Sequence, residues 1–149
     1  MKFEKFAKKV VPYCSTVLYN GQAYLKCGKT YAKIPLHVGQ IGSIDQFDEI
    51  LQAVLESEIY EEPAELCNAY LPSADGKSKD IVREYSDGEL SFCISNENFG
   101  LIERYDQAYI VNVDDEKFHG TALLIGKPVT DVGNFEADLI FTDIKMEEK

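Results

Sequence analysis

Apolar side chains recur with helical spacing at the start of the chain. Four of them stand three or four residues apart: Phe3, Phe6, Ala7 and Val10. This spacing places them on one face of an α-helix, and lysines fill most of the remaining positions. Pro12 ends the helix at or before Val11, because a residue that precedes proline disfavours helical geometry. The pattern predicts a short amphipathic helix.

The clearest local signal is a hairpin turn at Asn20-Gly21, between the strand-like runs 13–19 and 22–27. Both turn residues tolerate the positive φ angles of a two-residue type I′ turn, which pairs Tyr19 with Gln22. Alternation then predicts a core face and an outward face. The core face holds Cys14, Thr16, Leu18, Ala23, Leu25 and Cys27, and the outward face holds Tyr13, Val17, Tyr19 and Tyr24.

The same register places Cys14 opposite Cys27. Counting from the turn, this is a non-hydrogen-bonded pair, in which facing side chains approach most closely. We therefore predict that the two sulfurs are neighbours. Two buried thiols are the favoured state in a reducing compartment, and a cross-strand disulfide is the alternative.

A second amphipathic helix is expected over about residues 44–57. Ser43 caps it in this interpretation, and Gln46 completes a capping box. Its buried stripe comprises Ile44, Phe47, Ile50, Leu51, Val54 and Leu55. Asp45, Asp48 and Glu49 lie near the positive end of the helix dipole, which favours them there.

The second half of the chain is mainly β in pattern. Asp87-Gly88 predicts a two-residue turn that pairs Ser86 with Glu89. One face of that hairpin is expected in the core: Ile81, Arg83, Tyr85, Leu90, Phe92 and Ile94. The stretch 99–113 fits either a hairpin around Asp106-Gln107 or a helix, and strands are favoured. Further strands are expected at 121–125 and 137–144.

These elements define an α+β fold, made mainly of antiparallel β-sheet with an N-terminal helix and a second, acidic helix at about 44–57. The length of 149 residues suits one domain. The linker-like segment 71–79 either divides this domain or forms a surface loop. No apolar run is long enough for a membrane span, and no secretory signal is evident, so a cytoplasmic location is expected.

Charge is unevenly distributed around a net value of −11. Residues 1–33 carry seven lysines and one glutamate, whereas residues 34–76 carry nine acids and neither Lys nor Arg. The overall sign opposes general binding to a phosphate backbone, whereas the lysines of residues 1–33 allow a local basic patch. The acidic candidates for an interaction surface are Asp48, Glu49, Glu56, Glu58, Glu61 and Glu62. The basic candidates are Lys2, Lys5, Lys8 and Lys9.

Strings that suggest catalysis or ligand binding lack their required context. Gly28-Lys29-Thr30 ends like a phosphate-binding loop, but Ala23 stands where that loop needs glycine. No recognised spacing joins Cys14 and Cys27 with His37 as zinc ligands, and His119 has no evident nucleophilic partner. The run 114–116, Asp-Asp-Glu, fits a solvated turn better than a cation site. The sequence therefore predicts no catalytic set, no metal and no cofactor.

Part of the first quarter of the chain resembles uncharacterised prophage proteins of Gram-positive bacteria. The residues that carry this resemblance are Met1–Lys5, Val11–Tyr13, Asn20-Gly21, Tyr24–Gly28 and Ile34-Pro35. It implies a phage or mobile-element accessory role and no particular activity. We expect a non-catalytic interaction module that contacts a protein partner or a second copy of itself. The alternatives are an acidic DNA mimic or anti-defence regulator, and a nucleic-acid accessory protein that uses the basic N-terminus.

Overall fold

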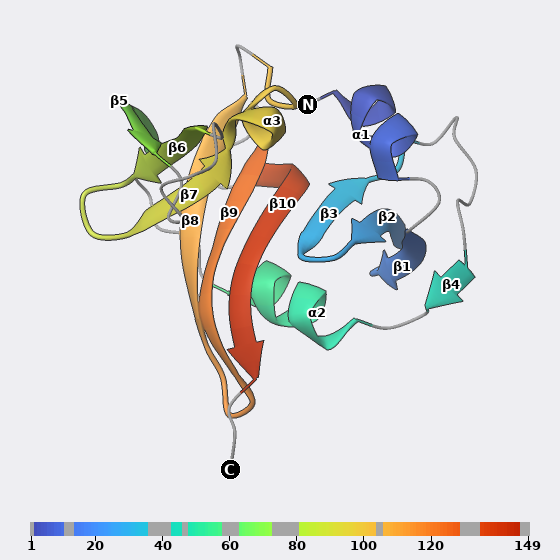
Figure 1. The fold of residues 1–149 in the computed structure, drawn as a ribbon. Helices are drawn as coiled ribbons and strands as arrows, with labels where there is room; N and C mark the ends of the chain where they lie inside the picture. The colour runs from blue at the N-terminus through green and yellow to red at the C-terminus, as the bar shows by residue number, and fades with distance from the viewer. Residues whose placement is uncertain are drawn as a thin grey trace.

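A computed structural model describes residues 2–10, 14–35, 43–45, 48–57, 63–72, 81–103, 106–128 and 135–146 (Figure 1). Its helices are α1 (Phe3–Val10), α2 (Glu49–Glu56) and α3 (Asn96–Phe99). The strands of the first half are β1 (Ser15–Tyr19), β2 (Gln22–Cys27), β3 (Thr30–Lys33), β4 (Ser43–Asp45) and β5 (Glu65–Pro72). Those of the second half are β6 (Ile81–Ser86), β7 (Ser91–Ser95), β8 (Gln107–Asp114), β9 (Phe118–Pro128) and β10 (Phe135–Met146).

The strands form two sheets. A seven-stranded sheet has the order β4-β1-β2-β3-β10-β9-β8, and a three-stranded sheet has the order β5-β6-β7. All described pairings are antiparallel except the short parallel pairing of β4 with β1. The predicted α+β class, dominated by antiparallel sheet, is confirmed.

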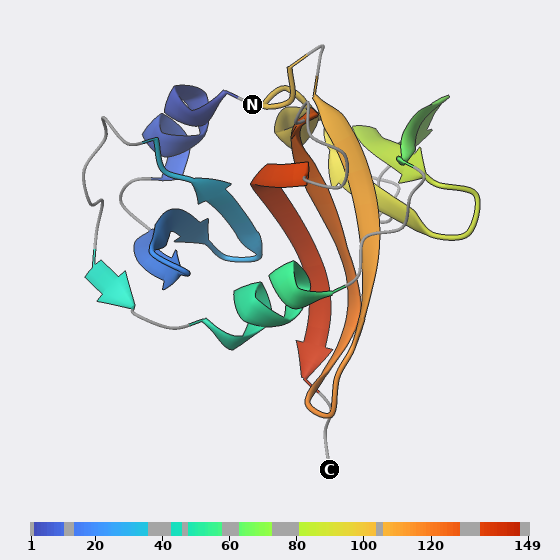
Figure 2. The same cartoon turned by 180° about the vertical axis from the view of Figure 1, so that it is seen from behind.

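Both faces of the large sheet are buried. The small sheet and α2 lie on opposite sides of β8–β10 (Figures 1 and 2). The inter-sheet cluster comprises Phe3, Phe6, Leu25, Ala32, Ile34, Ala64, Tyr85, Phe92, Ile94, Leu101, Ala108, Ile110, Leu123, Ile125, Leu139 and Phe141. The α2 cluster comprises Val17, Tyr24, Tyr31, Leu51, Val54, Val111, Val113, Phe118, Ala122, Leu124, Ala137, Ile140 and Ile144. Successive residues of β9 alternate between the clusters, which explains its continuous apolar run.

The first hairpin follows its turn signal. Asn20 and Gly21 have φ angles of 48° and 78°, and Tyr19 pairs with Gln22 as expected. The assignment of its faces was partly wrong, because Val17 and Tyr24 are buried and Leu18 is 37% exposed. The large sheet is covered on both sides, so side chains on the supposed outward face pack in the α2 cluster instead.

The second helix begins later than its pattern predicted. Ser43–Asp45 is the strand β4, and it pairs with β1. Asp48, rather than Ser43, caps α2, because its carboxylate accepts a hydrogen bond from the backbone N–H of Leu51. The helix then runs from Glu49 to Glu56, and Gln46 lies outside the described residues.

The β6–β7 hairpin has the predicted faces but a different register. Ser86 pairs with Ser91 instead of Glu89, so the loop is two residues longer than expected. Asp87 stabilises this longer loop by accepting hydrogen bonds from the backbone N–H groups of Glu89 and Leu90. A shift of two residues preserves the alternation of a strand, so Tyr85, Phe92 and Ile94 remain buried.

In the stretch 99–113, the favoured strand structure is found only from Gln107 onwards, and the expected hairpin around Asp106-Gln107 is absent from the described residues. The short helix α3, capped by Ser95, ends at Phe99, and β8 begins only at Gln107. The strands expected at 121–125 and 137–144 are confirmed inside the longer β9 and β10. Residues 73–80, most of the predicted linker, lie outside the described residues.

Candidate functional site

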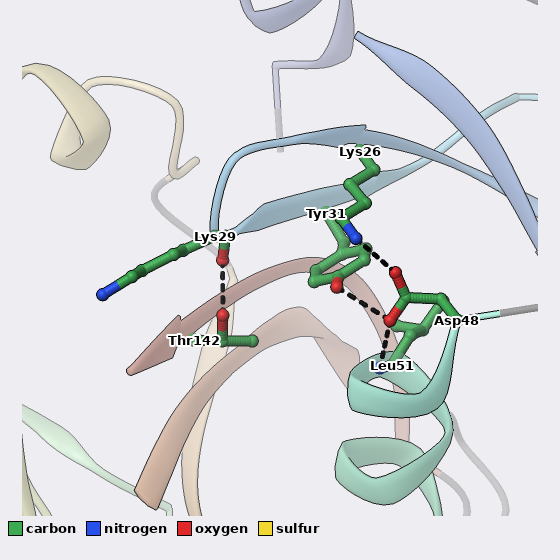
Figure 3. A network of polar contacts seen from close by, with 6 residues as sticks. All are labelled: Lys26, Lys29, Tyr31, Asp48, Leu51 and Thr142. Atoms are coloured by element: carbon green, nitrogen blue, oxygen red, sulfur yellow. Dashed lines mark hydrogen bonds and ion pairs between the residues drawn. The ribbon is translucent and has the colours of Figure 1, made fainter. Parts of the chain in front are cut away.

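Asp48 fixes the position of the acidic helix α2. Figure 3 shows its carboxylate between the two strands of the β2–β3 hairpin and the first turn of α2. Lys26 forms an ion pair with it, the Tyr31 hydroxyl donates at 2.9 Å, and the Leu51 N–H donates at 2.8 Å. The Asp48 side chain is only 6% exposed. Asp48, one of the predicted interaction residues, therefore lies largely buried in contacts that join α2 to β2 and β3.

The electrostatics of this network agree with its geometry. Burial alone would raise the pKa of Asp48, but the hydrogen bonds from Lys26, Leu51 and Tyr31 and the charge of Lys26 together lower it. Burial, followed by the Asp48 charge, raises the pKa of Tyr31. Asp48 is therefore charged and Tyr31 neutral around pH 7, which joins α2 firmly to β2 and β3.

The outer face of α2 borders a surface depression that we call the acidic hollow. It is lined by Glu49, Gln52, Ala53, Glu56, Asp115, Glu116, Lys117 and Phe118, and its volume is about 290 Å³. The first four residues belong to α2, and the others to the β8–β9 turn and the start of β9. The structure thus joins two acidic stretches that the sequence analysis treated separately.

The β8–β9 turn holds its acids outward. The Asp115 N–H donates to the Phe118 carbonyl at 3.0 Å, and the Asp115 carboxylate accepts from the Lys117 N–H at 3.2 Å. Four carboxylates and one lysine line the hollow. Lys117 and Glu49 are 4.0 Å apart and both largely exposed, so this ion pair neutralises little. The hollow can therefore receive a positively charged group.

The other predicted acidic residues are not placed in this hollow. Glu58, Glu61 and Glu62 lie outside the described residues. Of the predicted acidic set, the structure brings Glu49 and Glu56 to the hollow. Sequence reasoning missed Asp115 and Glu116 as their neighbours, because only the packing of α2 beside β8 and β9 brings the turn there.

The predicted basic residues Lys5 and Lys8 are exposed on α1, and Lys2 is exposed just before it. The side chain of Lys9 lies outside the described residues. Between described residues, no ion pair joins the lysines of α1 to α2. The hairpin lysines do meet acids: besides Lys26 with Asp48, Lys29 lies 3.9 Å from Asp143 and Lys33 lies 3.5 Å from Glu136.

The two cysteines of the first hairpin lie together. Cys14 directly precedes Ser15, which pairs with Lys26, and Cys27 is the next residue of β2. Both are thiols, and both pack against the inter-sheet cluster. Burial, followed by the nearby Cys27, raises the pKa of Cys14.

A second concavity of about 380 Å³ was not expected from the sequence. This inter-sheet pocket is lined by Pro63, Ala64, Leu66, Tyr85, Phe99, Ile102, Glu103, Asp106, Gln107 and Ala108. Its walls are mostly apolar, which suits an apolar group.

The pKa of the Asp138 carboxyl on β10 is raised. Burial is the main cause and the charge of Asp106 adds to it, whereas nearby cations such as Lys127 oppose the rise.

The other strings with apparent chemistry have structural roles where they are described. Gly28-Lys29 is a tight turn whose Lys29 carbonyl accepts from the backbone and the hydroxyl of Thr142 (Figure 3). His119 is exposed and lies 3.3 Å from Asp114, and His37 is outside the described residues. Within the described ranges, no group of three His, Cys, Asp or Glu residues is arranged to hold a metal ion.

No helix in the described part of the chain has the length and apolar character to cross a membrane.

No protein-family model, curated protein or solved structure matches the chain.

Proposed function

We propose that the chain is a non-catalytic interaction module that binds a basic surface of a partner protein through the acidic hollow. The resemblance of its first quarter to prophage proteins supports an accessory role, and we place that role in the cytoplasm. A module of this kind needs a rigid surface with the complementary charge, rather than a catalytic constellation.

The observation that carries this proposal is the convergence of α2 with the β8–β9 turn. Glu49 and Glu56 come from the helix, and Asp115 and Glu116 come from the turn, yet the four border one concave surface. The buried Asp48 network fixes the start of the helix, so the backbone that carries Glu49 and Glu56 is in position before any partner arrives. Preorganised charges lower the cost of ordering on binding.

The same surface supports a DNA mimic as a second candidate. In that case the basic partner would be a DNA-binding protein, and the carboxylates would occupy positions of phosphates. Duplex DNA should then compete with the chain for a basic DNA-binding protein. A partner that binds both at once would exclude the mimic and leave the interaction module in place.

The proposal is testable with charge reversals that change the net charge equally. Glu56→Lys with Glu116→Lys alters the acidic hollow, whereas Glu65→Lys with Glu89→Lys alters exposed positions on β5 and the β6–β7 loop. A nona-arginine peptide serves as the probe, and its binding is measured by calorimetry at about 50 mM salt, where screening is weak.

We expect the hollow variant to weaken peptide binding at least about tenfold, and the control variant to weaken it less than about threefold. The difference should shrink as salt is raised, because exposed charges are screened. Equal weakening by the two variants would show that binding follows net charge alone, and the acidic hollow would then not be the site.

A further inference from the structure

The register of the first hairpin determines the distance between Cys14 and Cys27. Tyr19 and Gln22 flank the two-residue turn and form a hydrogen-bonded pair, and the pairs then alternate along the ladder. The ladder ends at the hydrogen-bonded pair of Ser15 with Lys26, and its continuation by one residue places Cys14 opposite Cys27 at a non-hydrogen-bonded position. Cα atoms of such pairs are about 4.5 Å apart, which lies within the range of roughly 4.4–6.8 Å that a disulfide needs.

The two side chains also lie on the same face of the hairpin. Both pack against the inter-sheet cluster, as does Ala23, which has the same alternation. Neither cysteine is fully buried, so small reagents can reach the pair. Position along the ladder, direction of the side chains and access therefore all favour bond formation between these two sulfurs.

We propose that Cys14 and Cys27 are a site of reversible disulfide formation, and that the oxidant is a low-molecular-weight disulfide of the glutathione class. One cysteine thiolate attacks the small disulfide, forms a mixed disulfide and releases one thiol. The second thiolate then attacks the mixed disulfide and releases the other thiol. The pair loses two protons and two electrons, and the small disulfide gains them as it becomes two thiols.

The other two cysteines provide an internal comparison. Cys67 lies on β5 and Cys93 on β7, and β6 separates these strands. Strands of a sheet are about 4.8 Å apart, so backbones two strands away from each other are about 10 Å apart, which exceeds the Cα separation that a disulfide needs. Cys67 is near enough to contribute to the raised pKa of Cys93, after burial and the charge of Glu84, but their strands are not neighbours. Oxidation should therefore select Cys14 and Cys27, although Cys93 is the most exposed of the four.

The bond would fasten the start of β1 to the end of β2, beside the turn at Gly28-Lys29. That turn is tied to β10 through the Lys29 carbonyl and Thr142. A disulfide here restricts the unfolded chain over the whole hairpin, so the oxidised protein should resist heat better than the reduced protein.

The experiment exposes the full chain to excess glutathione disulfide at pH 8, then denatures it in N-ethylmaleimide and measures the intact mass. We expect a loss of two hydrogen atoms and labelling of two thiols instead of four. Peptide mapping should give one crosslink, between Cys14 and Cys27. The melting temperature should rise by roughly 5 °C and return to its starting value with dithiothreitol.

Matched variants complete the test. Cys67→Ser with Cys93→Ser should keep both the crosslink and the rise in melting temperature, and Cys14→Ser with Cys27→Ser should lose both. If the second variant is poorly folded, the peptide map of the wild-type chain still decides. Four labelled thiols, a persistent glutathione adduct without a crosslink, or a crosslink through Cys67 or Cys93 would each overturn the proposal.

Discussion

The Asp48 side chain shows how much one buried carboxylate can determine. It caps α2, pairs with Lys26 and accepts from Tyr31, so three elements depend on its charge. Removing it leaves a mostly buried lysine stem and an unsatisfied helix N-terminus. We expect Asp48→Ala to lower the free energy of unfolding at pH 7 by about 3 kcal/mol, measured by urea denaturation. Asp143→Asn, at an exposed ion pair with Lys29, should cost less than about 0.5 kcal/mol.

The lowered pKa of Asp48 also predicts a pH dependence. A carboxylate whose pKa is lower in the folded state stabilises the fold above its unfolded pKa of about 3.9, and this stabilisation disappears as pH falls through the folded value. Asp48→Asn keeps a capping oxygen but cannot ionise. The difference in unfolding free energy between wild type and this variant should therefore be largest above about pH 5 and shrink below pH 4. A difference that stays constant down to pH 2 would contradict the assigned role.

Gly120 permits the close approach of β9 and β10. Its φ angle is 152°, and a Cβ atom placed there would lie 2.0 Å from the Asp143 carbonyl oxygen. Because the obstacle is backbone, Gly120→Ala must displace the paired strand, and we expect a loss of more than about 2 kcal/mol in thermal or urea denaturation. Gly21→Ala is the matched control: it meets only backbone strain at φ 78°, with no atom nearby, and should cost about 1 kcal/mol.

At the scale of elements, the sequence predicted best where the signal is local. The turn at Asn20-Gly21 lies next to the strands that it joins, so two adjacent residues determine the register of the hairpin. The start of α2 depends instead on Lys26 and Tyr31, which are distant in the chain and bind the capping residue Asp48. It also depends on β1, because Ser43–Asp45 pairs with β1 as a strand and cannot be helical. A capping pattern at Ser43 cannot reveal these partners.

The β6–β7 loop was mispredicted for a related reason. Asp87-Gly88 is a turn signal, but the Asp87 carboxylate reaches two further N–H groups and favours a longer loop. We expect Asp87→Ala to lower stability by about 1 kcal/mol and to speed hydrogen exchange in β6 and β7. Glu89→Ala, in the same loop with an exposed side chain, should leave exchange unchanged. Equal exchange in both variants would show that the carboxylate does not hold the loop.

At the scale of the whole molecule, alternation alone could not predict that both faces of the large sheet are covered. Tyr24 illustrates this, because alternation assigned it to the outward face of the hairpin, yet it is buried in the same cluster as Leu51 and Val54 of α2. The acidic hollow has the same origin. Each acidic stretch was visible in the sequence, but their meeting depends on where α2 packs against β8 and β9.

The layering leads to a prediction about cooperativity. Leu123 and Leu124 are adjacent on β9, yet Leu123 packs in the inter-sheet cluster and Leu124 in the α2 cluster. Both are essentially fully buried, so Leu123→Ala and Leu124→Ala should each cost about 2–5 kcal/mol. Because β9 belongs to both clusters, either substitution should lower the free energy of unfolding of the whole chain. This includes the small sheet, which packs on one side of β9 only.

Far-UV circular dichroism reports both sheets, and hydrogen exchange in β6 and β7 reports the small sheet. In both variants the two transitions should coincide, as they do for a single cooperative domain. If residues 71–79 instead divide the chain into two units, Leu124→Ala would lower the large-sheet transition and leave β6 and β7 protected. Coincident transitions in Leu124→Ala would be the stronger evidence for one cooperative domain. The Leu124 side chain lies on the face away from the small sheet, so its removal can destabilise that sheet only through the shared strand β9.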